Sequence, residues 1–191
     1  MRRGRGWEMA QADLDSYGEI AGRTVGLVGY GGVPRLLAPI LAAMGARIVY
    51  WSRTRREDAI GEPPDLDDLL AISDIVSLHL PLVPETERLL DAGRLERMKP
   101  GALLVNTARG GLVDEPALVE LLRKGHLGGA ALDVFAQEPV PADHPMLGLP
   151  NVVIAPHIAW HTPETVSRSL AVAIENSRRL LTGVSLLHQV Q

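Results

Sequence analysis

Three ionisable residues of different kinds, Arg109, Glu138 and His157, each follow an apolar run typical of a β-strand. An imidazole can exchange a proton near neutral pH, and a neighbouring carboxylate raises its pKa and fixes its orientation. A guanidinium can bind a carboxylate through two parallel hydrogen bonds. Together with a nicotinamide, this set suits the interconversion of a 2-hydroxy acid and a 2-oxo acid. Each residue alone is more often an ordinary loop or surface residue, so the interpretation depends on all three.

A glycine-rich turn near the start of the chain predicts a dinucleotide site. Gly29 and Gly31 follow an apolar run at residues 25–28, and an apolar pattern of helical period begins directly after them. In such a unit Gly29 permits the tight turn, and Gly31 lets the backbone approach a diphosphate. The amides of Gly32 and Val33 then point at phosphate oxygens, assisted by the helix dipole. The turn by itself is also compatible with a structural role.

Two prolines depart from the usual pattern of this unit. Pro34 stands where the third glycine of G-x-G-x-x-G would serve close packing of helix against strand. Proline is tolerated in a first helical turn, because its missing N–H would be unpaired there. Pro39 lies inside the predicted helix, where it should cost about 3 kcal/mol or bend the helix.

Strands and helices alternate along most of the chain. Apolar runs predict strands at residues 25–28, 48–51, 75–80, 102–106, 129–134 and 152–155. Helical patterns occupy residues 33–44, 66–72 and 89–98, Asp114 caps a helix that runs to Lys124, and a last helix is capped by Thr162 and stopped by Gly183. This alternation predicts an α/β fold with a Rossmann-like, doubly wound parallel sheet in three αβα layers. Ligands of such sheets bind at the carboxyl ends of the strands, so the residues after each strand are the site candidates.

Composition excludes several classes of function. The 191 residues are 46% hydrophobic, enough for one good core, and the net charge is −4. Like charges cluster only at residues 2–5 and 53–56, which argues against nucleic acid or an anionic membrane as the main partner. The chain has no cysteine, which excludes disulfides and thiolate metal sites, and we expect no metal. No apolar stretch reaches the length of a spanning helix, so a soluble, cytoplasmic protein is expected.

Several spaced motifs resemble the D-isomer-specific 2-hydroxyacid dehydrogenases. They are VNTARGGLVDE at residues 105–115, ALDVFAQEP at 131–139 and APHIAW at 155–160, with SLHLPL at 77–82 and Asn151-Val152 fitting the same pattern. The resemblance covers nearly everything from about residue 22 to residue 181. Because the motifs occur in the family's order, the likeness is far more specific than the glycine turn.

The resemblance implies a role for each ionisable residue. Arg109 matches the arginine that binds the substrate carboxylate and polarises its carbonyl, and His157 matches the general acid/base. Glu138 matches the carboxylate that keeps this histidine protonated for reduction. Asp133 resembles the partner of the nicotinamide side. Residues that resemble the lining of the cofactor cleft are Pro81, Thr86, Thr107 and Ala108.

The choice of cofactor can be argued from the end of the second strand. A unit that prefers NAD has an acidic residue there, which accepts hydrogen bonds from the ribose 2′-hydroxyl. Residues 51–56 read WSRTRR and hold no carboxylate. Ser52 can hydrogen-bond a 2′-phosphate and Arg53 can pair with it, as in the NADP-using glyoxylate and hydroxypyruvate reductases that this sequence resembles. We therefore predict NADP(H), with NAD(H) as the alternative; the arginines could also belong to an ordinary solvated loop.

The resembled proteins begin with a substrate-binding segment that this sequence does not contain. We expect residues 1–22 to be a connecting arm and residues 23–160 to be the dinucleotide-binding domain. Residues 161–191 would form a helix and tail that normally pack on the missing segment. The chain could be a fragment, a truncated gene product with poor turnover, or the partner of a separately encoded lobe.

Two functions follow from the sequence. The first is the cofactor-binding, catalytic-residue-bearing domain of an oxidoreductase that acts on a small 2-oxo or 2-hydroxy acid of the glyoxylate or hydroxypyruvate kind. The second is a non-catalytic NAD(P)-binding module, or a truncated pseudoenzyme with an interaction role. The resemblance also implies a homodimer.

Overall fold

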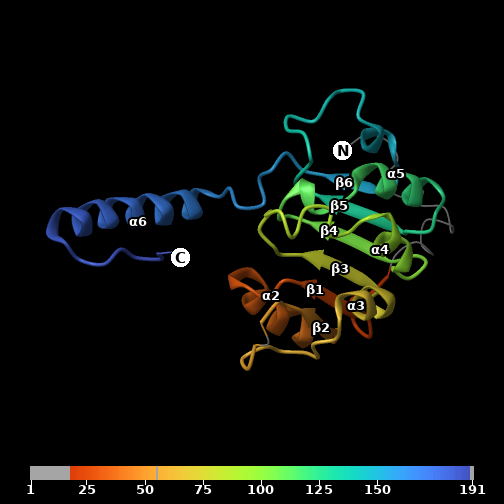
Figure 1. The fold of residues 1–191 in the computed structure, drawn as a ribbon, viewed down its shortest axis with the longest axis horizontal. Coiled ribbons are helices and arrows are strands. Elements are labelled where there is room, and N and C mark those ends of the chain that lie inside the picture. Colours follow the sequence, from red (N-terminus) through yellow and green to blue (C-terminus); the bar gives the residue numbers. More distant parts are fainter. Residues whose placement is uncertain (1–17, 55, 190–191) are drawn as a thin grey trace, which may run out of the picture. The chain divides into compact units, whose positions relative to one another are not determined.

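The computed structural model describes residues 18–54 and 56–189. The chain divides into two compact units, one ending at Ile154 and one beginning at Ala155. The first unit holds the sheet, and the second holds one long helix (Figure 1). Most of the connecting arm predicted for residues 1–22 lies outside the described residues.

Six parallel strands form a single sheet in the order β2-β1-β3-β4-β5-β6. The strands are β1 (Thr24–Val28), β2 (Arg47–Trp51), β3 (Ile75–Leu78), β4 (Leu103–Asn106), β5 (Gly129–Leu132) and β6 (Val152–Ile154). All six predicted strands are present, and some end one or two residues earlier than predicted. The chain runs outward from β1 to β2 and then crosses back to β3, so the direction of winding reverses between β1 and β3. Open α/β sheets bind their ligands at this switch point.

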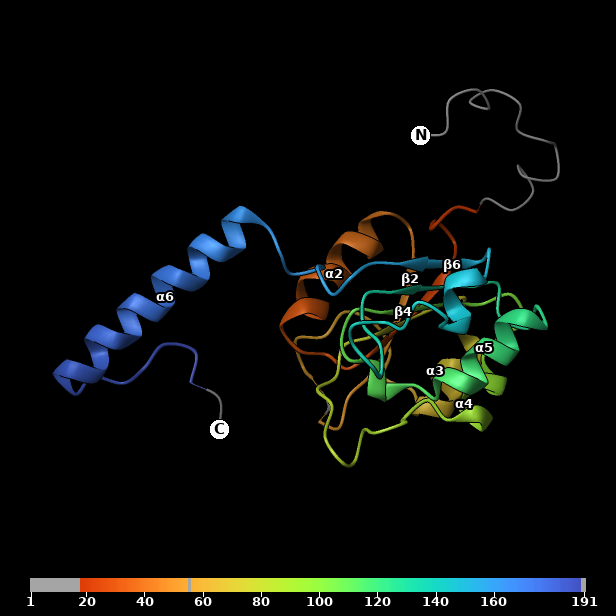
Figure 2. The same ribbon diagram turned by 90° about the horizontal axis from the view of Figure 1, so that it is seen from above.

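Helices cover both faces of the sheet, which confirms the predicted three-layer arrangement (Figure 2). On one face lies α2 (Gly32–Ala43), over a small core cluster from β1 and β2. On the other face lie α3 (Leu66–Ile72), α4 (Ala92–Arg97) and α5 (Glu115–Arg123), over a larger cluster drawn from most of the strands. Successive side chains of a strand point to opposite faces, so uninterrupted apolar runs supply both clusters.

Helix α2 does not bury the largest apolar residues of its pattern. Its buried residues are Pro34 and Ala38, and the helix continues through an exposed Pro39. The most prominent apolar residues of the pattern are at least half exposed: Val33, Leu36, Ile40 and Met44. Leu37 and Leu41 of the same pattern are half-buried and pack against the cluster, so the helix contacts the sheet through Pro34, Ala38 and these two leucines.

Side chains that accept hydrogen bonds from the first turn set the start of two other helices. Asp114 accepts from the N–H of Ala117 and caps α5, as predicted. Asp91 accepts from the N–H of Arg94, so α4 begins at residue 92 rather than at the predicted 89.

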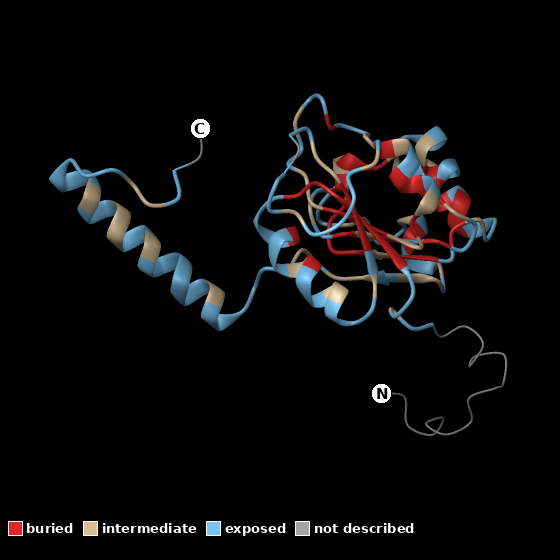
Figure 3. Ribbon diagram, turned by 90° about the horizontal axis from the view of Figure 1, so that it is seen from below, coloured by how far each residue is buried: buried red, intermediate tan, exposed pale blue. Residues whose placement is uncertain are grey.

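The second unit contains α6 (Pro163–Thr182), with the predicted cap at Thr162 and the predicted end at Gly183. Gly183 has φ +69°, a left-handed conformation that favours glycine. Buried residues gather in the strands of the first unit and on the inner faces of its helices, whereas α6 has none (Figure 3). Within residues 18–54 and 56–189, no helix is both long and apolar enough to cross a bilayer.

Candidate functional site

A cavity of about 300 Å³ opens at the switch point of the sheet. The residues that line it follow β1, β3 and β4. They are Gly31 with Gly32, Val33 and Pro34 of the first turn of α2, then His79, Leu80 and Pro81 after β3, and Thr107, Ala108 and Arg109 after β4. The fold therefore brings most of the predicted cofactor residues into one cleft together with Arg109.

The glycine turn leaves room for a ligand group on the cavity side. Gly29 has φ +98°, and a Cβ on it would lie 2.5 Å from the carbonyl oxygen of His79, so only glycine fits there. At Gly31 and Gly32 a Cβ would meet no atom within 4 Å. The N-terminus of α2 has no side-chain cap and no acidic residue in its first turn. Open space in front of uncapped amides fits the diphosphate of a dinucleotide.

A buried amide shapes the loop that carries Arg109. Asn106 ends β4, and its Nδ2 donates to the carbonyl oxygen of Arg109 at 2.9 Å. Its Oδ1 accepts from the N–H of Ala108 at 3.0 Å. The side chain of Arg109 stays exposed, and its Nη1 donates to the carbonyl oxygen of Ala108 at 2.6 Å. Sequence reasoning gave Asn106 no role, although a lone amide at the end of an apolar run was a usable signal.

His79 is a second residue of the cleft that sequence reasoning passed over. Its Nε2 is hydrogen-bonded to Ser77 Oγ at 2.9 Å, along one side of the chain as it leaves β3. Burial lowers the pKa of His79 to about 4. The imidazole is therefore neutral at pH 7 and adds no charge to the cleft.

The loop after β5 carries Glu138 and lies directly against the Arg109 segment. Glu138 Oε1 accepts from the N–H of Phe135 at 2.9 Å. A Cβ on Gly110 would collide with the backbone of Phe135 and Ala136, so the two loops touch through this glycine. The first unit therefore brings the loops that carry Arg109 and Glu138 into contact.

Other predicted residues lie outside the lining of the cleft. Thr86 is buried, and its Oγ1 donates to the carbonyl oxygen of Pro81 at 2.7 Å, which closes the loop instead. Asp133 is also buried. Ser52 is half-buried and Arg53 is exposed, both directly after β2.

His157 is the third residue of the second unit, which begins at Ala155. It is half-buried and has φ +55°, a left-handed conformation that is uncommon for a residue with a side chain. Such conformations concentrate at functional sites.

The sequence matches a known family profile and its curated members. Residues 1–159 match the profile of the D-isomer specific 2-hydroxyacid dehydrogenase, NAD binding domain. A glyoxylate reductase of Thermofilum pendens is 46% identical over 170 residues, which cover 86% of this chain and 50% of that protein. The chain thus spans about half the length of the curated relatives that it matches.

Solved structures show the same fold. The TT0316 protein of Thermus thermophilus superposes with a TM-score of 0.87 at 46% identity, over 94% of this chain and 57% of that one. The D-lactate dehydrogenase of Lactobacillus jensenii, solved with NAD⁺, gives a TM-score of 0.88 at 30% identity, over 96% of this chain and 59% of that one. Profile, relatives and fold agree, and the chain belongs to the D-isomer-specific 2-hydroxyacid dehydrogenase family, whose NAD-binding domain it carries.

Proposed function

We propose that this chain is the cofactor-binding and catalytic-residue-bearing part of an oxidoreductase for a small 2-oxo or 2-hydroxy acid. The observation that carries the proposal is the cleft at the switch point, where Arg109 lines the same cavity as the uncapped N-terminus of α2. Relatives named glyoxylate reductase support glyoxylate, or the similar hydroxypyruvate, as the substrate class.

The proposed mechanism divides the work among three residues. Arg109 binds the substrate carboxylate and polarises the neighbouring carbonyl, and its exposed guanidinium suits this task. His157 gives a proton to the carbonyl oxygen during reduction and takes it back during oxidation. Glu138 keeps the His157 imidazole protonated and oriented. When bound, the nicotinamide supplies or accepts the hydride.

The substrate test uses the chain as it is. The oxidation of NADPH by glyoxylate or hydroxypyruvate is followed through the loss of NADPH absorbance, for the unmutated protein and for His157→Ala. We expect turnover to fall at least about a hundredfold in the variant, which is the lower end of a general acid/base contribution. Cofactor binding without His157-dependent turnover would overturn the oxidoreductase and support the non-catalytic binding module.

We also propose that the cofactor is NADP(H) rather than NAD(H). Solved relatives include an NAD⁺ complex and an imino acid reductase in complex with NADPH, so the fold accommodates both cofactors. Ser52 and the exposed Arg53 follow β2, where an NAD-preferring unit has a carboxylate. A hydroxyl and a guanidinium there favour a 2′-phosphate.

Dissociation constants decide between the two cofactors. We expect NADPH to bind more tightly than NADH, and Arg53→Ala to weaken NADPH about tenfold, as the loss of one charge-assisted hydrogen bond would. The same variant should leave NADH binding nearly unchanged. Tighter binding of NADH by the unmutated protein would end this proposal.

The family resemblance further supports a homodimer in the cytoplasm as the working form. Sedimentation equilibrium of the chain at micromolar concentration tests the assembly: a mass of twice 20.6 kDa is expected. A single-chain mass over that range would contradict the dimer.

A further inference from the structure

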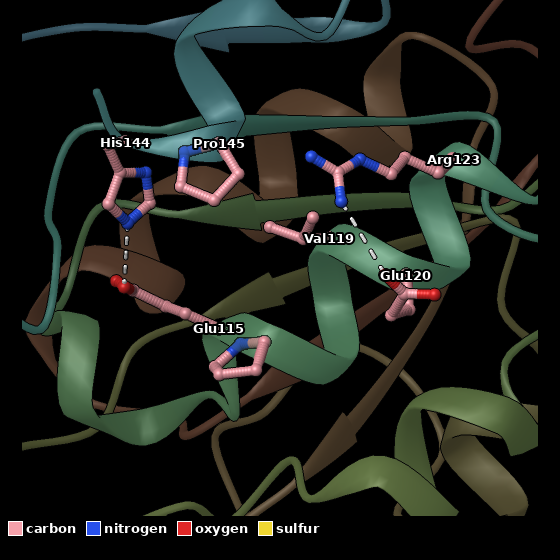
Figure 4. Close-up of a pocket in the computed structure, with 7 residues that line it drawn as sticks. Glu115, Val119, Glu120, Arg123, His144 and Pro145 are labelled. Carbon is pink, nitrogen blue, oxygen red and sulfur yellow. Dashed lines mark ion pairs between the residues drawn. The ribbon is translucent and has the colours of Figure 1, made fainter. Parts of the chain in front are cut away.

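The loop that carries Glu138 is fastened to the start of α5 by one side chain. Glu115, the first residue of α5, accepts from the N–H of Ala136 through Oε1 at 2.6 Å. Its Oε2 lies 3.4 Å from Nε2 of His144 (Figure 4). The side chains are only 14% exposed for Glu115 and 17% for His144.

His144 closes the same loop from its other end. Its Nδ1 accepts from the N–H of Met146 at 3.4 Å, at the start of a short 3₁₀ helix, Pro145–Gly148. Its ring packs against Phe135 in a T-shaped arrangement, with ring centroids 5.7 Å apart and an interplanar angle of 78°. His144 therefore contacts Phe135 at the beginning of the loop, Met146 in the segment before β6, and Glu115 at the start of α5.

The braced backbone is the one that orients Glu138. The N–H of Phe135 donates to Glu138 Oε1, and the next N–H, from Ala136, donates to Glu115. The same two residues press against Gly110, directly after Arg109. Any shift of this backbone would therefore move Glu138 relative to the Arg109 segment.

We propose that Glu115 and His144 are positioning residues, which hold the backbone at Phe135 and Ala136 and thereby the carboxylate of Glu138. This proposal rests on the function proposed above, because the catalytic role of Glu138 is part of that proposed function. Neither residue lines the cleft, so their effect falls on the chemical step rather than on cofactor binding.

The same helix offers a matched control. Glu120 pairs with Arg123 at 3.6 Å and with Lys124 at 4.0 Å on the exposed side of α5. Figure 4 shows the two carboxylates on one helix, with Glu115 directed at His144 and Glu120 directed at Arg123. Glu120→Ala therefore removes a carboxylate from α5, as Glu115→Ala does, but leaves the contacts of Glu115 with the Glu138 loop in place.

The test compares Glu115→Ala, Glu115→Gln and Glu120→Ala. We expect Glu115→Ala to lower kcat for glyoxylate at least about tenfold, because small displacements of catalytic groups are costly, with the NADPH dissociation constant unchanged within about twofold. Glu115→Gln keeps an oxygen for the N–H of Ala136, and so should retain kcat within about threefold. Amide hydrogen exchange at Phe135 and Ala136 should accelerate in Glu115→Ala and stay unchanged in Glu120→Ala.

Two results would overturn the positioning role: equal kcat and exchange in Glu115→Ala and Glu120→Ala, or a loss of kcat that Glu115→Gln does not restore. If Glu115→Ala does not fold, the decision passes to His144→Ala, where unchanged exchange at Ala136 and unchanged kcat overturn the role. An unmutated chain without turnover refutes the proposed function alone. The exchange comparison then decides whether Glu115 holds the loop.

Discussion

Buried polar side chains beneath the cleft hold the loops in place, while the groups suited to a ligand stay exposed. Ser77, Thr86 and Asn106 are buried, and each is hydrogen-bonded at the end of a strand or within the following loop. Within the described part of the chain, no buried side-chain nitrogen or oxygen lacks a hydrogen-bond partner. Arg109 and Thr107 are exposed above them.

The buried imidazole of His79 predicts a pH dependence of stability. Burial lowers its pKa to about 4 in the folded protein, against 6.5 for the ordinary group. Between these values the unfolded chain binds more protons, so the free energy of unfolding falls as the pH drops from 6.5 to 4. The unmutated protein should lose up to about 3 kcal/mol over this window relative to His79→Asn, which has no group that titrates there.

Urea denaturation of both proteins at about pH 7.5 and about pH 4.5 measures this difference in the free energy of unfolding. Asp74 does not interfere, although it also titrates. Burial would raise its pKa, but hydrogen bonds from the Thr24 N–H and from Lys99 lower it, so its contribution is lost only at more acidic pH. Equal losses in the two proteins would refute the buried neutral state of His79.

At the scale of elements, local patterns predicted most of the fold. Continuous apolar runs identified all six strands, because a parallel strand covered on both faces must be apolar throughout. Asp114 and Thr162 identified helix starts, since capping depends on neighbours in sequence.

Features that depend on distant contacts could not be predicted in this way. The periodicity of α2 indicates a helix, but it does not say that the stripe with Ala38 packs on the sheet and that Leu36 faces outward. Likewise, the roles of Asn106 and Glu115 depend on backbone groups that only the folded chain brings near them. The predicted roles of Glu138 and His157 stay predictions.

Helix α2 also predicts a stabilising substitution. Pro39 is exposed in the middle of the helix and has no N–H for the carbonyl oxygen of Arg35, four residues earlier. Pro39→Ala should restore this hydrogen bond and raise the free energy of unfolding by about 1–3 kcal/mol. Pro34→Ala is the control: Pro34 is buried in the first turn, where no N–H is needed, so its replacement should give no gain. Denaturant unfolding of both variants measures the contrast, and a neutral or destabilising Pro39→Ala would contradict it.

At the scale of the whole molecule, the two units differ in how their structure is stabilised. The sheet unit encloses two apolar clusters. The segment from residue 155 to residue 189 has no buried residue, and Leu170 and Ile174 of α6 are at least about half exposed. Local interactions support this helix: its two caps and the ion pair of Glu175 with Arg179 at 2.9 Å. The prediction that it packs on a substrate-binding segment stays a prediction.

Hydrogen exchange should separate the two units. Amides of β1 and β3 should open only with global unfolding, whereas those of α6 should exchange with less protection, because α6 has no buried residue and most helical stability in proteins comes from packing. Mass spectrometry of peptides from both regions measures the difference. Equal protection of α6 and the central strands would show that the helix has a packing partner in solution.

The buried amide beneath the cleft determines the path of the loop above it. Asn106 holds the backbone atoms of residues 108 and 109, and the Arg109 guanidinium adds one hydrogen bond to the carbonyl oxygen of Ala108. Conversion of the amide itself to aspartate would set an anion against the carbonyl of Arg109 and disturb the whole loop. The backbone that presents Arg109 therefore depends on a single buried side chain.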